Sequence, residues 1–225
     1  MTANKIVLVP TLGVPDWQQR LADPEKHWRT GYSARAMAHS WEAAGGWPAE
    51  IAKLFTAAYG SVQPLLVVPE WKTALPGGNR ASQSDAFLLA RHQSGLVAAA
   101  IEGKVEESFG PLVGEWKSPA SAGKTERLDF LRSRLGLAGD IDGLHYQLLH
   151  RTVSALLEAE RFHASDAAMV VHSFSPEKRW FEAFALFANR LGGDALTGEP
   201  IQVNVPGKIS LVLGWAVGDA QFLQA

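Results

Sequence analysis

The sequence predicts an α/β domain in which helices flank a central sheet. Two apolar runs, 85–91 and 96–105, are separated by a short loop that ends in a glycine, which favours an antiparallel hairpin. The segment 144–160 has apolar side chains at helical spacing, and an apolar run of β character follows at 167–174. A hairpin, a long amphipathic helix and a buried strand together indicate helices packed against a sheet.

Two elements are predicted before the hairpin. The segment 33–44 is rich in helix formers, has Ser33 as a candidate N-cap and stops at Gly45, which predicts a helix. The apolar run 63–70 predicts a strand, and its prolines confine that strand to an edge position or a strand end. The order along the chain is therefore helix, strand, hairpin.

Two more elements are predicted at the C-terminal end. The segment 177–191 has the pattern of an amphipathic helix and is followed by a pair of glycines. The segments 201–205 and 209–217 predict a closing hairpin that extends the sheet. The aromatic face of the helix needs a partner, so these additions could also serve a homodimer.

The length and composition of the chain are typical of a globular protein. The chain has 225 residues, of which 47% are hydrophobic and 20% charged. We expect one domain over 1–225, with a core at about 33–175 and a C-terminal extension at 176–225. The absence of cysteine excludes disulfides and thiolate metal sites, and the apolar run in 1–10 is too short for a signal peptide or membrane span. We therefore expect a cytoplasmic bacterial protein with no membrane partner.

Charged side chains interrupt the apolar strands of the predicted hairpin. A two-residue turn at 93–94 would place Asp85 opposite Glu102, whereas a turn one residue later would place Asp85 opposite Lys104. Either register puts all three side chains on one face of the hairpin. Their alternative role is an ordinary surface ion pair of little energetic value. A charge within an apolar strand is costly unless it is paired or binds a metal, so the arrangement indicates a site.

Two carboxylates beside a lysine are typical of metal-assisted hydrolysis. Mg²⁺ takes oxygen ligands from one or two carboxylates and leaves its other positions to water and substrate phosphate. Asp85 and Glu102 are the expected ligands, and Mn²⁺ is the expected substitute ion. Lys104 could steady the scissile phosphate or the attacking hydroxide.

These residues resemble the PD-(D/E)XK nuclease superfamily, in which an Asp on the second core strand precedes Glu/Asp-X-Lys on the third. Asp85 and 102–104, Glu-Gly-Lys, match that signature in type, order and approximate spacing, although Ser84 replaces the proline. The resemblance implies a restriction-endonuclease-like core with a mixed central sheet. The chain as a whole also resembles a bacterial domain family of uncharacterised function, through the segments Glu25-Lys-His-Trp28, Ser82-Gln-Ser-Asp85, Glu102-Gly-Lys-Val105 and Gln147-Leu-Leu-His-Arg151.

The superfamily resemblance also implies roles for residues outside the hairpin. Its first core helix often adds an acid to the metal site, and Glu42 is the carboxylate available in 33–44, with a solvated helix residue as the alternative. Its later helix often presents a glutamine, which gives Gln147 a supporting catalytic role and makes Arg151 a phosphate contact. Arg80 and Gln83 could also contact phosphate, with an ordinary loop role as the alternative.

The resemblance implies a metal-dependent endonuclease that hydrolyses phosphodiester bonds in nucleic acid, with DNA as the expected substrate. The formal net charge of −2 gives no global basic field, so a local basic patch would have to hold the phosphates. One alternative is a non-catalytic nucleic-acid-binding or regulatory protein that keeps the nuclease fold. Another is a small-molecule enzyme that uses a central cavity.

Overall fold

The computed structural model describes residues 11–225, so the prediction made for 1–10 lies outside the described residues. The strands are β1 (Val62–Thr73), β2 (Ser82–His92), β3 (Gly95–Lys104), β4 (Asp166–Ser173), β5 (Pro200–Val203) and β6 (Ser210–Val217). The helices are α1 (Val14–Arg20), α2 (Pro24–His27), α3 (Ser33–Ala44), α4 (Ala49–Tyr59), α5 (Val113–Trp116), α6 (Ala122–Leu135), α7 (Tyr146–Arg161), α8 (Phe181–Arg190) and the 3-10 helix η1 (Ala220–Gln224). Within 11–225, no helix has the length and apolar character that crossing a membrane would require.

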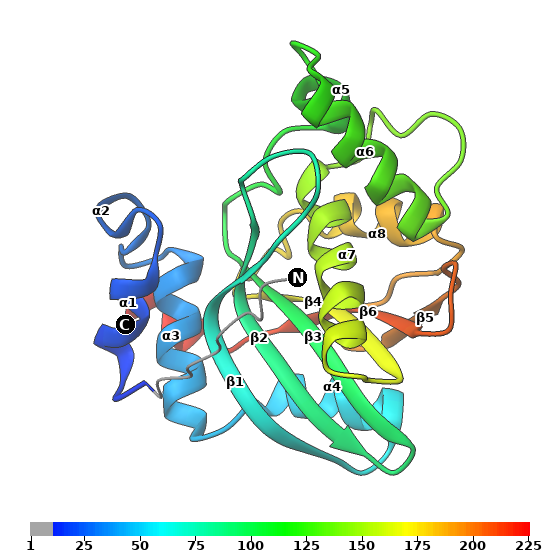
Figure 1. The fold of residues 1–225 in the computed structure, drawn as a ribbon. Helices are drawn as coiled ribbons and strands as arrows, with labels where there is room; N and C mark the ends of the chain where they lie inside the picture. The colour runs from blue at the N-terminus through cyan, green and yellow to red at the C-terminus, as the bar shows by residue number, and fades with distance from the viewer. Residues whose placement is uncertain (1–10) are drawn as a thin grey trace.

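The six strands form one mixed sheet in the order β1-β2-β3-β4-β6-β5 (Figure 1). β1, β2 and β3 are antiparallel neighbours, whereas β4 runs parallel to β3 and β6 runs parallel to β4. β5 closes the far edge antiparallel to β6. The prediction of an α/β domain with a sheet flanked by helices is confirmed, and β1 lies at an edge as its prolines indicated.

The register of the β2–β3 hairpin settles the choice between the two predicted turns. His92 pairs with Gly95, and Ala86 pairs with Ile101, so the turn consists of the two residues 93–94. This is the register that was predicted to place Asp85 opposite Glu102. It is held by the apolar alternation of both strands, because a slip of one residue would turn every buried side chain to the other face.

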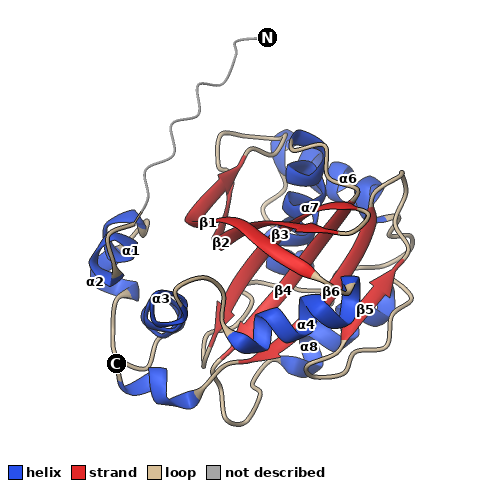
Figure 2. Ribbon diagram, turned by 90° about the horizontal axis from the view of Figure 1, so that it is seen from below, coloured by secondary structure: helices blue, strands red, loops and turns tan. Residues whose placement is uncertain are grey.

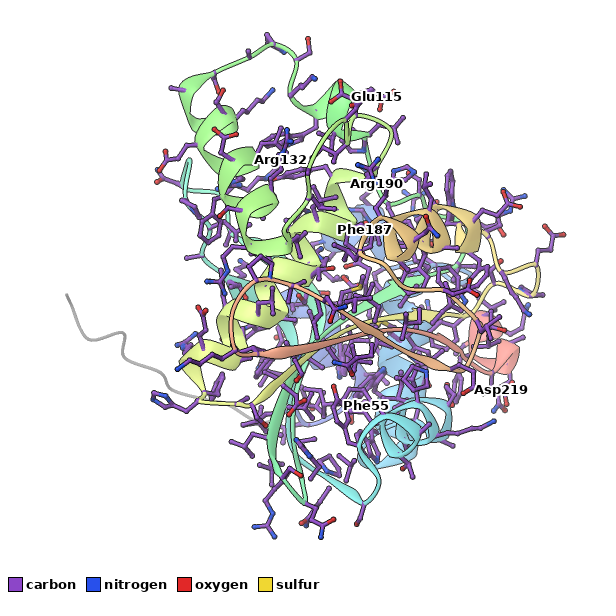
Figure 3. The ribbon with its side chains drawn as sticks, turned by 90° about the vertical axis from the view of Figure 1, so that its right-hand side faces the viewer. Phe55, Glu115, Arg132, Phe187, Arg190 and Asp219 are labelled. Atoms are coloured by element: carbon purple, nitrogen blue, oxygen red, sulfur yellow. The ribbon has the colours of Figure 1, made fainter. Side chains whose placement is uncertain are left out.

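Two hydrophobic clusters cover the two faces of the sheet. α1, α3 and α4 pack on one face, and α6, α7 and α8 pack on the other. Figure 2 shows α4 and α7 on opposite sides of the strands. In Figure 3, Phe55 of α4 and Phe187 of α8 lie on opposite sides of the sheet, each fully buried in its own cluster. The core is therefore a three-layer sandwich of helix, sheet and helix.

The structure corrects several element predictions. The N-cap of α3 is Tyr32 rather than Ser33, whose backbone amide and hydroxyl both donate to the carboxylate of Glu107. β1 extends beyond the predicted run to Thr73, and α8 is shorter than the predicted helix. The C-terminal hairpin is confirmed, but its longer strand lies inside the sheet beside β4, and α4 was not predicted at all.

Candidate functional site

A polar hollow of about 300 Å³ lies where the β2–β3 hairpin meets the first turns of α7. We call it the acidic hollow, after the four carboxylates in its wall, those of Glu70, Asp85, Glu102 and Glu107. Its polar lining from the sheet and from α7 consists of Glu70 of β1, Gln83 and Asp85 of β2, Glu102 and Lys104 of β3, and Gln147 and Arg151 of α7. The structure thus brings the predicted residues of the hairpin and of the later helix into one site.

Glu102 accepts three hydrogen bonds inside the acidic hollow. Its Oε1 accepts hydrogen bonds from Lys104 Nζ and from Gln147 Nε2, both at 2.6 Å. Its Oε2 accepts a hydrogen bond from Arg151 Nε at 2.5 Å. The side chain is buried, and the charges of Arg151 and Lys104 outweigh the effect of burial and lower its pKa. Glu102 is therefore an ionised carboxylate held by two cations.

Asp85 lies at the start of the apolar part of β2. Its Oδ2 accepts a hydrogen bond from the backbone amide of Gly103 at 2.7 Å. Burial, followed by the negative charge of Glu102, raises the pKa of Asp85 to about 7. Unlike Glu102, Asp85 has no ion-pair partner among the described residues.

Glu70 is a third carboxylate of the acidic hollow, and the sequence analysis did not predict it as a site residue. Pro69 pairs with Ala86 and Trp71 pairs with Ser84, so Glu70 lies beside Asp85 on the neighbouring strand. Its Oε2 accepts a hydrogen bond from Gln83 Nε2 at 2.7 Å. Burial, followed by the charge of Asp85, raises the pKa of Glu70 to about 8.

The backbone of Glu70 is also unusual, with a φ of +54° inside β1. Left-handed conformations are uncommon for residues with a side chain and collect at functional sites. The signal available in the sequence was a carboxylate placed directly after an apolar run and Pro69.

The glycine between Glu102 and Lys104 lets two segments approach closely. A Cβ atom at Gly103 would overlap the side chain of Met37 on α3 and would come within 3.3 Å of Asp85 Oδ2. Met37 is fully buried, so it has little room to move away. The bond from the Gly103 amide to Asp85 therefore depends on the absence of a side chain here.

Arg151 connects the acidic hollow with a hydrogen-bonded pair beneath it. Its Nη1 donates to Ser82 Oγ at 2.9 Å, and Ser82 Oγ lies 2.8 Å from His150 Nδ1. Because arginine can only donate, the serine hydroxyl accepts from Arg151 and donates to the histidine. Burial, and then the charge of Arg151, lower the pKa of His150 well below its usual value, so the ring is neutral and suited to accept that bond.

A second hollow of about 670 Å³ adjoins the first. We call it the basic hollow. Its wall includes Leu75, Lys72, Arg80, Arg127, Trp116 and Tyr146, and it shares Gln83, Gln147 and Arg151 with the acidic hollow. Arg80 thus lies beside the predicted site rather than in it. Arg127 holds the loop after β1, because it donates to the carbonyl oxygens of Leu75, Pro76 and Gly78.

The structure does not bring Glu42 to the site. Its Oε1 accepts hydrogen bonds from Thr11 Oγ1 at 2.9 Å and from Trp17 Nε1 at 2.7 Å. Glu42 faces α1 instead of β3, and it ties the chain before α1 to α3. The structure therefore does not bring Glu42 together with the other predicted metal ligands, because its side chain points from α3 towards α1.

No group of three or more His, Cys, Asp or Glu side chains within 11–225 is already arranged as a set of ligands for a metal ion. The carboxylates of Glu70 and Asp85 nevertheless converge, and their mutual repulsion contributes to the raised pKa of Glu70. A divalent cation would relieve that repulsion, and Mg²⁺ needs only one or two carboxylates beside water and phosphate. The donor set therefore fits a hard cation held by Glu70 and Asp85.

The fold and the site together define an α/β protein with a mixed six-stranded sheet and a buried polar centre at the end of a hairpin. The chain belongs to the family described as a domain of unknown function, DUF6946, which matches residues 10–220. Neither a curated protein nor a solved structure matches the chain. The acidic hollow is therefore the feature of this chain that points to a chemical activity.

Proposed function

We propose that this protein is a metal-dependent nuclease of the PD-(D/E)XK type that hydrolyses phosphodiester bonds in DNA. The observation that carries the proposal is the convergence of Asp85, Glu102 and Lys104 from one hairpin into a hollow that also holds Gln147. The carboxylates are buried among cations and amides, an environment in which groups with shifted pKa values are typical of active sites.

The order of the elements supports the same proposal. A helix, α3, precedes the antiparallel strands β1, β2 and β3 with α4 inserted between, and α7 then leads to β4 parallel to β3. A helix, three antiparallel strands, a second helix and a further strand are the elements of the PD-(D/E)XK core. Asp85 lies on the second of these strands and Glu102 on the third, as that core would require.

A Mg²⁺ ion would be held by Asp85 and Glu70, with Glu102 as a further ligand once its cations are engaged elsewhere. When bound, such an ion lowers the pKa of its water and stabilises the charge that develops on the phosphate. The side chains around the ion have two further roles. Lys104, which donates to Glu102 at 2.6 Å, supplies a positive charge for the phosphate oxygens, and Gln147 orients the same carboxylate.

One observation favours the alternative of a non-catalytic nucleic-acid-binding protein. Both oxygens of Glu102 are engaged, by Lys104 and Gln147 on one side and by Arg151 on the other. A carboxylate in this state is satisfied without a metal, as expected of a protein that has kept the fold and lost turnover.

The test is cleavage of labelled DNA and RNA, single-stranded and duplex, with Mg²⁺ or Mn²⁺. Wild type is expected to cleave, Lys104→Ala to lose cleavage with little loss of nucleic-acid binding, and Lys53→Ala to behave as wild type. Lys53 is a suitable control because it is exposed on α4, across the sheet from α7. Nucleic-acid binding by the wild type without cleavage under any of these conditions would support the alternative.

A further inference from the structure

We propose that the basic hollow is a subsite for one unpaired nucleotide, so that the substrate is single-stranded nucleic acid or an unpaired end. The inference rests on the proposed function, because it assigns the substrate class of the same site. Three features of the hollow carry it: its unpaired cations, its aromatic wall and its size beside the acidic hollow.

The cations of the basic hollow are free to meet phosphate. Lys72 and Arg80 are both exposed, and neither forms an ion pair with another residue in the described part of the chain. Arg151 reaches the same hollow from the acidic side. Clustered Lys and Arg side chains supply most of the affinity of proteins for a nucleic-acid backbone. The charge of the basic hollow therefore favours the phosphates of a nucleic acid as its partner.

Part of the wall of the basic hollow is aromatic and apolar. The rings of Trp116 and Tyr146 stack with centroids 3.9 Å apart and planes inclined by 9°, and Leu75 lies in the same wall. Lys124 Nζ lies 5.7 Å from the centroid of the Trp116 ring and adds a cation beside it. Trp116 and Tyr146 cover one face of each other, so a base and its sugar would meet the remaining apolar surface of this wall beside the cations. Proteins that bind single strands combine aromatic side chains with a cationic track in this way.

The size and position of the hollow select an unpaired nucleotide. Its volume of about 670 Å³ is within the range of pockets that enclose one small organic molecule, roughly 300–1,000 Å³. It shares Gln83, Gln147 and Arg151 with the acidic hollow, so an occupant would adjoin the phosphate at the carboxylates. A base in a duplex is paired and stacked and could enter only after it was extruded, whereas an unpaired base enters at no such cost.

The test is fluorescence anisotropy of the full chain in EDTA, which prevents cleavage, with a fluorescein-labelled 12-nucleotide DNA strand, the matching RNA strand and the blunt DNA duplex. The single strands are expected to bind at least ten-fold more tightly than the duplex. Lys72→Gln and Arg80→Gln should each weaken single-strand binding and lower the slope of log affinity against log salt by about 0.7. Lys208→Gln, an exposed lysine between β5 and β6, is the control and should change neither quantity.

A further variant tests the aromatic wall. Trp116→Leu should weaken single-strand binding about ten-fold with an unchanged salt slope, because it removes apolar contact and no charge. Circular dichroism checks that the variant is folded, and a folded variant with unchanged affinity would contradict the role of the wall.

Equal or tighter binding of the duplex would overturn the inference, as would Lys72→Gln and Arg80→Gln behaving like Lys208→Gln. Cleavage of duplex DNA that depends on Lys104 would leave the proposed nuclease intact and reject only the single-strand subsite. Preferential binding of single strands without any cleavage would support the subsite and reject the nuclease. The two failures are therefore distinguishable.

Discussion

Arg151 Nε and Glu102 Oε2 are joined by a 2.5 Å hydrogen bond inside the protein, where both side chains are buried. The guanidinium is hydrogen-bonded to a carboxylate oxygen that a metal ion would need as a ligand. Because Arg151 also lines the basic hollow, an anion bound there would attract the same guanidinium. Under the proposed function, the binding of substrate phosphate and of the metal would thus be linked through one side chain.

Removing the guanidinium should favour the cation. We expect Arg151→Gln to bind Mn²⁺ several-fold more tightly than wild type in the absence of nucleic acid, because it exposes Glu102 and removes a positive charge from the site. The variant should also lose about 3 kcal/mol of stability, since a buried charge loses one of its partners. Isothermal calorimetry with Mn²⁺ and urea denaturation measure the two effects. Weaker Mn²⁺ binding in a folded variant would contradict the competition.

The raised pKa of Glu70 predicts how stability depends on pH. In the folded protein this pKa is about 8, against an ordinary value of 4.5. The folded state therefore keeps a proton that the unfolded chain has released, and the associated stability is lost as the pH rises through 8. Above pH 7 the buried His150 and His172, whose pKa values are lowered from 6.5, are neutral in both states and do not mask the effect.

In EDTA, the free energy of unfolding of the wild type should fall between pH 7 and pH 9, and Glu70→Gln should reduce that fall. Urea denaturation at several pH values gives the measurement. Mn²⁺ should stabilise the wild type more at pH 8 than at pH 6.5, because it binds the ionised carboxylates. A wild type and variant with the same pH slope would show that Glu70 titrates normally.

The close approach at Gly103 predicts a packing cost. Gly103→Ala should destabilise the protein by about 1–3 kcal/mol, because the added methyl group overlaps buried Met37. The cost should be smaller when the same change is made in a Met37→Ala background, since the obstacle is then shortened. Urea denaturation of the four proteins in this double-mutant cycle provides the test. Additive effects would contradict a direct contact.

Glu42 provides a prediction of independence from the site. Glu42→Gln should leave Mn²⁺ binding unchanged and should lower stability by about 1 kcal/mol, through weaker hydrogen bonds to Trp17 and Thr11. Calorimetry and thermal unfolding report the two quantities separately. Loss of Mn²⁺ binding in this variant would restore the original prediction from the sequence.

The hairpin part of the site was predictable because its geometry is local. A two-residue turn and the alternation of β2 and β3 determine which side chains face α7, so Glu102 and Lys104 could be placed from the sequence alone. Gln147 and Arg151 followed from the superfamily resemblance, and their spacing of four residues keeps them on one side of α7.

The rest of the site was not predictable from alternation. Leu66, Val68 and Trp71 all pack in the cluster on the α7 face, although 66 and 68 are even positions and 71 is an odd one. The alternation of side chains along β1 is therefore interrupted between positions 68 and 71, and Glu70 lies at that interruption. The positive φ of Glu70 cannot be predicted from the pattern of hydrophobic residues. Glu42 was misplaced for a related reason, because the direction of its side chain depends on contacts with α1 that no local pattern encodes.

The prolines of β1 also bear on how copies of this protein can meet. β1 is an outermost strand, and Pro64 and Pro69 within it carry no amide hydrogen to offer to an added strand. The opposite border, β5, is only four residues long. Both edges of the sheet therefore disfavour edge-to-edge pairing with the strand of another molecule, which is the usual route to aggregation of exposed strands. A homodimer such as the sequence analysis allowed for would have to form through helices and loops, without extending the sheet.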